Sequence, residues 1–299
     1  MTTAARPSSV LVVGLVRDCA RCIRADVDRL RRALQSFGRV QWLLVESDST
    51  DDSLAQLLAL AGELPGFRSL SLGALRTSLP LRTDRLAHCR NAYLAELRDN
   101  PLYADVELVL VSDFDGVNTL LSADALLSCW QRDDWDVCTA NQAGPYYDIW
   151  ALRHPLWSPN DWYAVHQFLR RHGCSDEKAL RLALHSRMIT IAPDSDWIEV
   201  DSAFSGLGVY RRAAFDGVRY EGLDGHGAEV CEHVALHWQM RQRGRRIFIN
   251  PRLINTRGTE HSAALRLPHT LLRMARRPLQ WAYDRLRGRV RRHPGQGGA

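Results

Sequence analysis

Short apolar runs alternate along the chain with longer segments in which apolar residues recur every three or four positions. The β-branched apolar runs predict buried strands at residues 9–16, 40–45, 67–72, 106–112 and 135–140. Helical spacing between them predicts helices at residues 20–37, 54–64, 85–97 and 122–130. Such an alternation is typical of an α/β fold with a mostly parallel sheet flanked by helices on both faces.

The second half of the chain has a less regular pattern. Residues 150–197 are rich in Trp, His and Pro, and we expect one helix there, at 162–172. A small-residue turn at 205–208 leads into the apolar pair Val209-Tyr210, and a helix at about 230–241 and a strand at 246–250 follow. We therefore predict a single α/β domain over residues 1–260 and a separate tail over residues 261–299.

Two acidic clusters directly follow predicted strands. One is the polar run at residues 46–53, and the other is Asp113-Phe114-Asp115. In parallel sheets, ligands bind outside the carboxyl ends of the strands. We therefore expect both clusters to lie at one edge of the sheet, around a shared ligand.

Asp113 and Asp115 can both turn toward one cation, because they are two residues apart at the end of a buried strand. Hard ions such as Mg²⁺ or Mn²⁺ bind carboxylate oxygens and share their remaining positions with substrate phosphates. The same pair is common at solvated strand ends, but the apolar run before it and Gly116 after it favour a metal site.

The run at residues 46–53 has two interpretations. Glu46 and Asp48 could accept hydrogen bonds from the N–H groups of a uracil or guanine and from ribose hydroxyls. Alternatively, Ser49 or Asp51 caps the helix that begins near Ser53. Both interpretations can hold for different residues of the run.

Charge is concentrated in the tail. The 299 residues carry a formal net charge of +5, whereas residues 261–299 hold nine arginines and one aspartate, so the body up to residue 260 is mildly acidic. An acidic body argues against a nucleic-acid-binding core. The tail is basic and amphipathic, so it either lies on an anionic membrane surface or forms a final helix packed on the domain.

Other residues narrow the chemistry. Lys178 is the single lysine, which argues against a Walker loop or a Schiff-base lysine. The seven cysteines lack a disulfide spacing, and the N-terminal apolar run is too short for a signal peptide, so we expect a cytoplasmic protein. If its tail binds an anionic membrane surface, the protein would lie at the inner face of the membrane. Cys19 and Cys22 have redox spacing without the rest of a thioredoxin-like pattern. His233 and His237 are four apart on a predicted helix, where core packing is favoured over metal binding.

Six segments resemble, in order, landmarks of GT-A fold glycosyltransferases. They are Glu46-Ser47-Asp48-Ser49-Thr50-Asp51, the helix at 82–91, Asp113-Phe114-Asp115, the acceptor-side segments at 146–153 and 205–210, and Cys231-Glu232-His233-Val234. The last is similar to a helix of the cryptococcal-type capsule mannosyltransferases and their bacterial relatives. The landmarks cover residues 10 to about 255, and they are more specific for the fold than for the sugar.

The resemblance implies a set of donor-site roles. The nucleotide would contact Glu46, Asp48, Arg82, Arg85, Arg90 and Asp113, with the arginines on the diphosphate. Asp115 would be the firmer metal ligand, with Asp113 assisting. His261 would be an additional metal ligand, although a surface histidine is the alternative.

The resemblance also implies acceptor-side carboxylates. Glu232 would face the acceptor hydroxyl and deprotonate it in an inverting reaction, or stabilise the oxocarbenium-like centre in a retaining one. Glu229, expected one turn earlier on the same helical face, is the reserve candidate. Inverting families usually have Glu-Asp here, whereas Glu232 is followed by His233. The Trp and Tyr residues at 146–163 either stack on sugars or belong to the core.

The expected function is that of a metal-dependent glycosyltransferase in polysaccharide biosynthesis. With Mn²⁺ or Mg²⁺, it would move a hexose, in the resembled family mannose, from a GDP- or UDP-linked donor to a glycan or lipid-linked acceptor. A nucleotidyltransferase making a nucleotide-sugar is one alternative, but it would have a Gly-rich loop where residues 17–22 contain no glycine. A non-enzymatic membrane-surface or nucleic-acid-binding protein is the other.

Overall fold

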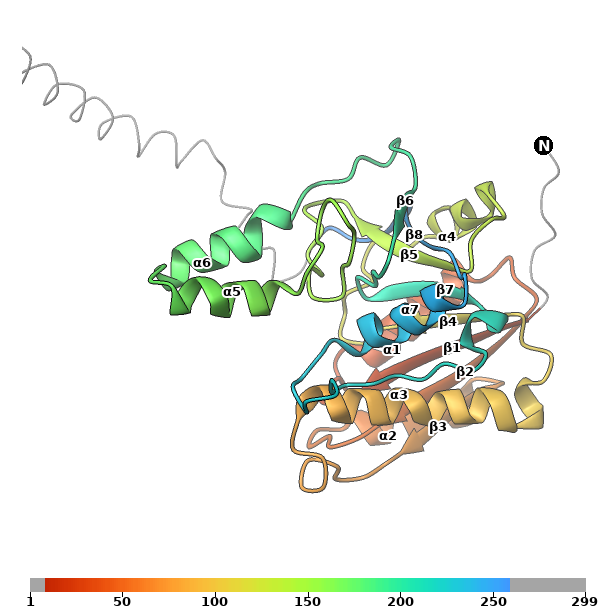
Figure 1. The fold of residues 1–299 in the computed structure, drawn as a ribbon. Coiled ribbons are helices and arrows are strands. Elements are labelled where there is room, and N and C mark those ends of the chain that lie inside the picture. The colour runs from red at the N-terminus through yellow and green to blue at the C-terminus, as the bar shows by residue number, and fades with distance from the viewer. Residues whose placement is uncertain (1–8, 259–299) are drawn as a thin grey trace, which may run out of the picture. The chain divides into compact units, whose positions relative to one another are not determined.

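The structure is a computed structural model, and it describes residues 9–258 (Figure 1). Residues 1–8 and 259–299 lie outside the described part, so the predictions for His261 and the basic tail stay predictions. Within the described part, no helix is long and apolar enough to cross a membrane.

A single eight-stranded sheet, in the order β3-β2-β1-β4-β7-β5-β8-β6, forms the centre of the described chain. In chain order its strands are β1 Ser9–Val16, β2 Arg39–Glu46, β3 Phe67–Ser71, β4 Leu108–Ser112, β5 Val137–Gln142, β6 Ile198–Val200, β7 Leu207–Arg211 and β8 Ile247–Thr256. All run in one direction except β7 and β6, which are antiparallel to their neighbours. The predicted α/β fold with a mostly parallel sheet is confirmed.

The two faces of this sheet are covered by α1 Ile23–Ala33, α2 Ser53–Glu63, α3 Arg82–Asp99, α4 Ala123–Leu127 and α7 Glu232–Gln242. Helices α5 Trp162–Arg171 and α6 Asp176–Ala183 pack against each other to the side of the sheet (Figure 1). Short 3-10 turns occur at Pro101–Tyr103, Ser128–Gln131, His185–Arg187 and Arg212–Phe215. Apolar residues of α1, α2 and α4 pack with alternate residues of β1, such as Val10 and Val12. Helices α3 and α7 lie on the near side of the sheet in Figure 1.

The predicted helices and strands all occur, with ends shifted by a few residues, but α6, β6 and β7 were not predicted. Helix α6 lies in the polar run at 175–178, which sequence analysis read as irregular. Ser175 accepts a hydrogen bond from the Lys178 N–H, and Asp176 and Glu177 occupy the first turn, so this run is a helix start. Strand β6 is too short to show a period, and it forms through pairing with β8.

Candidate active site

A cavity of about 290 Å³ opens at the carboxyl ends of β1, β2 and β4. Its lining comes from both acidic clusters and from the start of α3. The lining residues are Leu15, Val16, Arg17, Cys19, Val45, Ser47, Asp48, Arg82, Arg85, Leu86, Cys89, Asp113, Phe114 and Asp115. The structure therefore brings the two clusters together at one edge of the sheet. The cavity is close in size to the smaller pockets that bind small molecules.

Most of the run at 46–53 holds the neighbouring loop after β1. Asp18 accepts hydrogen bonds from the Thr50 N–H and hydroxyl, and Ser49 accepts one from the Asp18 N–H. The Ser53 hydroxyl accepts a hydrogen bond from the Cys19 N–H. The polar side chains after β2 thus fix the shape of the cavity wall.

The N-cap residue of α2 is Asp52, without a side-chain cap hydrogen bond, so the predicted cap at Ser49 or Asp51 is wrong by one or more residues; Asp51 instead holds the backbone on both sides of this point. One of its carboxylate oxygens accepts the Ser53 N–H at 2.9 Å, and the other accepts the Ala20 N–H at 3.0 Å. The pKa of Asp51 is lowered, most by a hydrogen bond with the Ser53 side chain and further by these two backbone bonds. Asp51 is therefore occupied with the backbone and leaves ligand binding to its neighbours.

Glu46 and Asp48 differ in how far their oxygens are already occupied. Glu46 is buried, and its two oxygens accept hydrogen bonds from the Ser49 N–H and the Ser71 hydroxyl, at 2.9 and 2.6 Å. Asp48 lines the cavity, and one oxygen accepts the Arg76 N–H. Its other oxygen, Oδ2, is buried and finds no hydrogen-bond partner among the described residues. Asp48 is therefore the better placed of the two to accept a hydrogen bond from a ligand.

Asp113 lies beside other acids. Burial raises the pKa of Asp113 to about 7, and the charges of Asp115, Asp148 and Glu232 add to this, while Arg90 opposes it. A divalent cation between Asp113 and Asp115 would relieve this repulsion. In residues 9–258, no group of three His, Cys, Asp or Glu side chains is arranged to hold a metal. An ion here would take one or two carboxylates from these aspartates and its other ligands from phosphate and water, which suits Mg²⁺ or Mn²⁺.

A buried acid on α1 supports the turn that follows these aspartates. Asp26 is fully buried, and its Oδ2 accepts the Gly116 N–H at 2.8 Å, while Oδ1 pairs with Arg29. Gly116 has φ +88°, a conformation that favours glycine. Sequence analysis missed Asp26, although its place among Ile23 and Val27 on the apolar face of a helix was a usable signal.

Arg90 and Glu232 form a buried ion pair behind the cavity. Arg90 Nε donates to Glu232 Oε1 at 3.0 Å, and Nη2 lies 3.8 Å from Asp113 Oδ1. The guanidinium packs against the rings of Phe204 and Tyr220. Neither Arg90 nor Glu232 is part of the cavity lining. The Arg90 guanidinium therefore connects Glu232, which the resemblance assigns to the acceptor side, to Asp113, which it assigns to the metal.

The predicted position of Glu229 is wrong. Helix α7 begins at Glu232, so Glu229 lies in the preceding loop and does not share a helical face with it. Its Oε1 accepts hydrogen bonds from the Thr83 N–H and hydroxyl, both at 3.0 Å. These bonds lower the pKa of Glu229 and cap the start of α3. The Glu229 carboxylate therefore has a structural role at the start of α3.

The two arginines at the start of α3 both line the cavity but are held differently. Arg85 is buried, and its Nη1 donates to the carbonyls of Leu79 and Pro80 at 2.6 and 2.7 Å. Arg82 is exposed, and no hydrogen bond of its guanidinium is seen within residues 9–258. Arg82 is thus free to move toward a phosphate, whereas Arg85 presents a fixed charge.

The histidines of α7 are packed rather than metal-binding. His237 is fully buried and hydrogen-bonds with the Ser202 and Tyr210 hydroxyls, both at 2.9 Å. Burial lowers the pKa of His237 to about 3, so the ring is neutral. His233 stacks on Phe204 with ring centroids 3.8 Å apart. The core interpretation of both histidines agrees with this geometry.

The remaining sequence candidates also pack into the structure. Burial raises the pKa of the Cys19 thiol to about 11, which disfavours the thiolate that redox chemistry needs. Trp150 donates its indole N–H to Asp161, and Trp157 donates to the Arg187 carbonyl. Tyr146 is fully buried. Several aromatic residues at 146–163 are therefore structural.

No protein-family model and no curated protein matches the sequence. The structure is similar to the mannosyltransferase PcManGT from Pyrobaculum calidifontis in complex with GDP-Man and Mn²⁺, at 16% identity and a TM-score of 0.47, over 85% of this chain and 57% of that chain. It is also similar to S. aureus TarS 1–349 in complex with UDP-GlcNAc, at 15% identity and a TM-score of 0.46, over 85% of this chain and 61% of that chain.

A third similar structure is glucosyl-3-phosphoglycerate synthase from Mycobacterium tuberculosis in complex with UDP, at 11% identity and a TM-score of 0.41, over 83% of this chain and 69% of that chain. The chain spans less than two thirds of the length of the first two proteins. Likeness at this level does not extend to activity, so support for a function comes from the site itself.

Proposed function

We propose that the protein is a metal-dependent glycosyltransferase that moves a sugar from a nucleoside-diphosphate sugar to an acceptor hydroxyl. One observation carries the proposal. The cavity at the carboxyl edge of the sheet is lined both by Asp113 and Asp115 and by Asp48, whose Oδ2 has no partner among the described residues. A site with a cation end and a hydrogen-bond acceptor end suits a nucleoside diphosphate.

In this proposal, different side chains bind different parts of the donor. Asp115 and Asp113 hold Mn²⁺ or Mg²⁺ together with the diphosphate, and His261 adds a ligand. When bound, the metal neutralises the charge of the departing diphosphate. Arg82 and Arg85 add positive charge at the same end. Asp48 accepts hydrogen bonds from the base or ribose, with Glu46 holding the loop from behind.

Glu232 is the acceptor-side carboxylate of the proposal. Arg90 engages its Oε1 and fixes its orientation. The second oxygen, Oε2, is the one that would meet an acceptor hydroxyl. Resemblance of residues 231–234 to the capsule mannosyltransferases supports a hexosyl donor with a GDP or UDP carrier. The basic segment at 261–299 supports a membrane-proximal, lipid-linked acceptor.

Thermal unfolding with UDP or GDP, with and without Mn²⁺, tests the proposal. A nucleotide at about 100 times its Kd stabilises the native state by about 2.7 kcal/mol. We expect this stabilisation to require Mn²⁺ and to be lost in Asp115→Ala, a substitution at an exposed position. Glu232→Gln should keep the stabilisation and lose sugar transfer.

Three results would contradict the proposal. Full Mn²⁺-dependent stabilisation of Asp115→Ala would show that the metal binds elsewhere. A response to nucleoside triphosphates alone would favour the nucleotidyltransferase alternative. Binding that depends only on residues 262–299 would favour the non-enzymatic alternative, and a truncated chain ending at residue 261 separates that case.

A further inference from the structure

Asn118 lies at the junction of four segments beneath the aspartate pair. Its side chain is fully buried. The amide nitrogen donates to the Ser112 hydroxyl at 3.0 Å, to the Asp113 carbonyl at 3.1 Å and to the Gly206 carbonyl at 3.4 Å. The amide oxygen accepts a hydrogen bond from Asn255 at 2.9 Å. One side chain thus joins the end of β4, the loop before β7 and strand β8.

Asn255 fixes the orientation of that amide. Its nitrogen donates to Asn118 Oδ1 and, at 2.7 Å, to the Ser205 carbonyl. Because the Asn255 nitrogen is a donor, the Asn118 atom facing it must be the oxygen, and the Asn118 nitrogen must point toward Asp113. Asn255 is also fully buried. The two amides therefore have a single compatible arrangement.

The loop they hold is strained. Ser205 and Gly206 have φ values of +61° and +79°. A Cβ on Gly206 would lie 2.8 Å from Val117. Left-handed backbone at a non-glycine residue persists only where its surroundings impose it, and it concentrates at functional sites. Here the imposed conformation aims the Gly206 carbonyl at the Asp113 N–H, with which it forms a 2.9 Å hydrogen bond.

Both peptide groups of Asp113 are consequently fixed from outside the cavity. Its N–H donates to Gly206, and its carbonyl accepts from Asn118. On the opposite side of the turn, Asp26 holds the Gly116 N–H. The backbone that carries the two aspartates is therefore held at Asp113 and at Gly116.

We propose that Asn118, backed by Asn255, is a positioning residue that sets the aspartate pair for metal binding. This inference rests on the proposed function. Asn118 itself touches neither the cavity nor the ion. Its effect passes through the Asp113 backbone. Replacing Asn118 should therefore weaken metal binding by more than the accompanying loss of folding stability explains. Supporting groups of this kind typically change metal affinity by about 10–100-fold.

The chain offers a matched control in Asn141. Asn141 on β5 is equally buried, and its amide nitrogen donates to the carbonyls of Ile191 and Pro251, both at 3.0 Å. It makes no contact with Asp113 through these bonds. Asn141→Ala therefore removes buried hydrogen bonds from the same sheet without disturbing the aspartate turn.

The experiment measures Mn²⁺ affinity, by the electron paramagnetic resonance signal of free Mn²⁺ in titrations of the full chain with and without UDP or GDP. Urea unfolding of each variant gives its stability. We expect Asn118→Ala to weaken Mn²⁺ binding by about 10-fold or more. Asn141→Ala should change it less than about 2-fold at a similar loss of stability. Asn255→Ala retains the Asn118 side chain, and its Mn²⁺ affinity should fall between those of the other two variants. This variant tests the positioning role if Asn118→Ala does not fold.

The outcomes separate the two proposals. If the wild-type chain binds no Mn²⁺ with either nucleotide, the proposed function fails, and the positioning role fails with it. If the wild type binds but the Asn118 or Asn255 variants bind as Asn141→Ala does, only the positioning role is overturned. A loss of affinity equal in all three variants likewise overturns it, because that result would reflect stability alone.

Discussion

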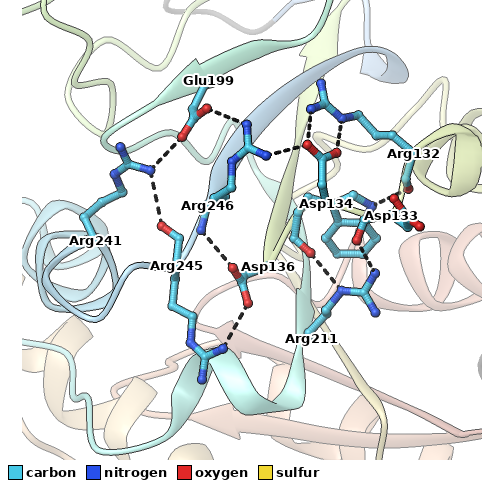
Figure 2. A network of polar contacts seen from close by, with 10 residues as sticks. Arg132, Asp133, Asp134, Asp136, Glu199, Arg211, Arg241, Arg245 and Arg246 are labelled. Carbon is cyan, nitrogen blue, oxygen red and sulfur yellow. Dashed lines mark hydrogen bonds and ion pairs between the residues drawn. The ribbon is translucent and has the colours of Figure 1, made fainter.

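The two edges of the sheet both carry many charges, and Figure 2 shows how those at the amino ends of β5 and β8 are used. Asp134 pairs with Arg132 and Arg246, and Glu199 pairs with Arg246 and Arg241. Hydrogen bonds from Arg132 lower the pKa of Asp134, and those from Arg246 lower the pKa of Glu199. Each of these acids has at least two guanidinium partners.

At the carboxyl edge the balance is reversed. Asp113 lies near Asp115, Asp148 and Glu232, with Arg90 as the counter-charge, and its pKa is raised to about 7. Asp48 keeps a buried oxygen without a partner in the described chain. Charges that satisfy one another hold strands together, whereas acids that repel one another around a cavity are suited to a bound cation.

The largest effect expected from this comparison comes from breaking the ion pair behind the cavity. In Arg90→Ala, Glu232 would be left buried and unpaired, since both side chains are only 5% exposed. Removing one partner of a buried pair costs about 3–5 kcal/mol. Urea unfolding at neutral pH measures this, with Arg90→Lys as the variant that keeps the charge. A loss below about 1 kcal/mol would mean that the pair is solvated, contrary to the structure.

A second prediction uses the buried neutral histidine of α7. The folded-state pKa of His237, about 3, is below the unfolded value of about 6.5. Between these values the unfolded chain binds a proton that the native state does not, so stability falls as pH decreases from about 6.5 toward 3. His237→Gln removes this contribution, because glutamine does not titrate.

The difference between wild type and His237→Gln isolates the effect from other groups, including Asp113, whose raised pKa acts with the opposite sign. Below about pH 6, the wild type should lose up to about 1.4 kcal/mol more per pH unit than the variant. Urea unfolding at pH 7.5, 6.5 and 5.5 measures the difference. His88→Gln, at an exposed position on α3, is the control. Parallel curves for wild type and His237→Gln would show that the ring titrates normally in the folded state.

The smallest effect should come from the amino edge. Arg246 is 41% exposed, so its pairs with Asp134 and Glu199 are screened by water. Arg246→Ala should cost roughly 0–1 kcal/mol at low salt and less at 1 M NaCl, where the screening length is about 3 Å. It should leave Mn²⁺ binding unchanged. Weaker Mn²⁺ binding in this variant would show that the two edges are coupled.

Much of the fold was predictable because most strands are short apolar runs that can be recognised from their own residues. Strand β1 and helix α1 follow directly from the pattern of their residues. The acidic ends of β2 and β4 could also be placed at one edge, because parallel strands end on the same side. Helix α6 was predictable in principle from the Ser175 cap, and it was missed because the run looked merely polar.

The supporting residues were not predictable from the sequence. Asn118 and Asn255 are 137 residues apart, and Asn118 and Gly206 are 88 apart. No local pattern brings such positions together. The position of Glu229 failed for a related reason, since its partner Thr83 lies 146 residues away at the start of α3. Sequence motifs thus indicated the groups that face the cavity better than those that hold them.

Strand β7 follows β5 in the chain but lies between β4 and β5 in the sheet. During synthesis, β1, β2, β3 and β4 can pair as soon as residue 112 has left the ribosome. The Asp113 amide, however, has no acceptor until Gly206 has been made. A nascent chain can therefore form the half of the sheet from β1 to β4 early, whereas the support of the Asp113 turn is completed only once Gly206 is available.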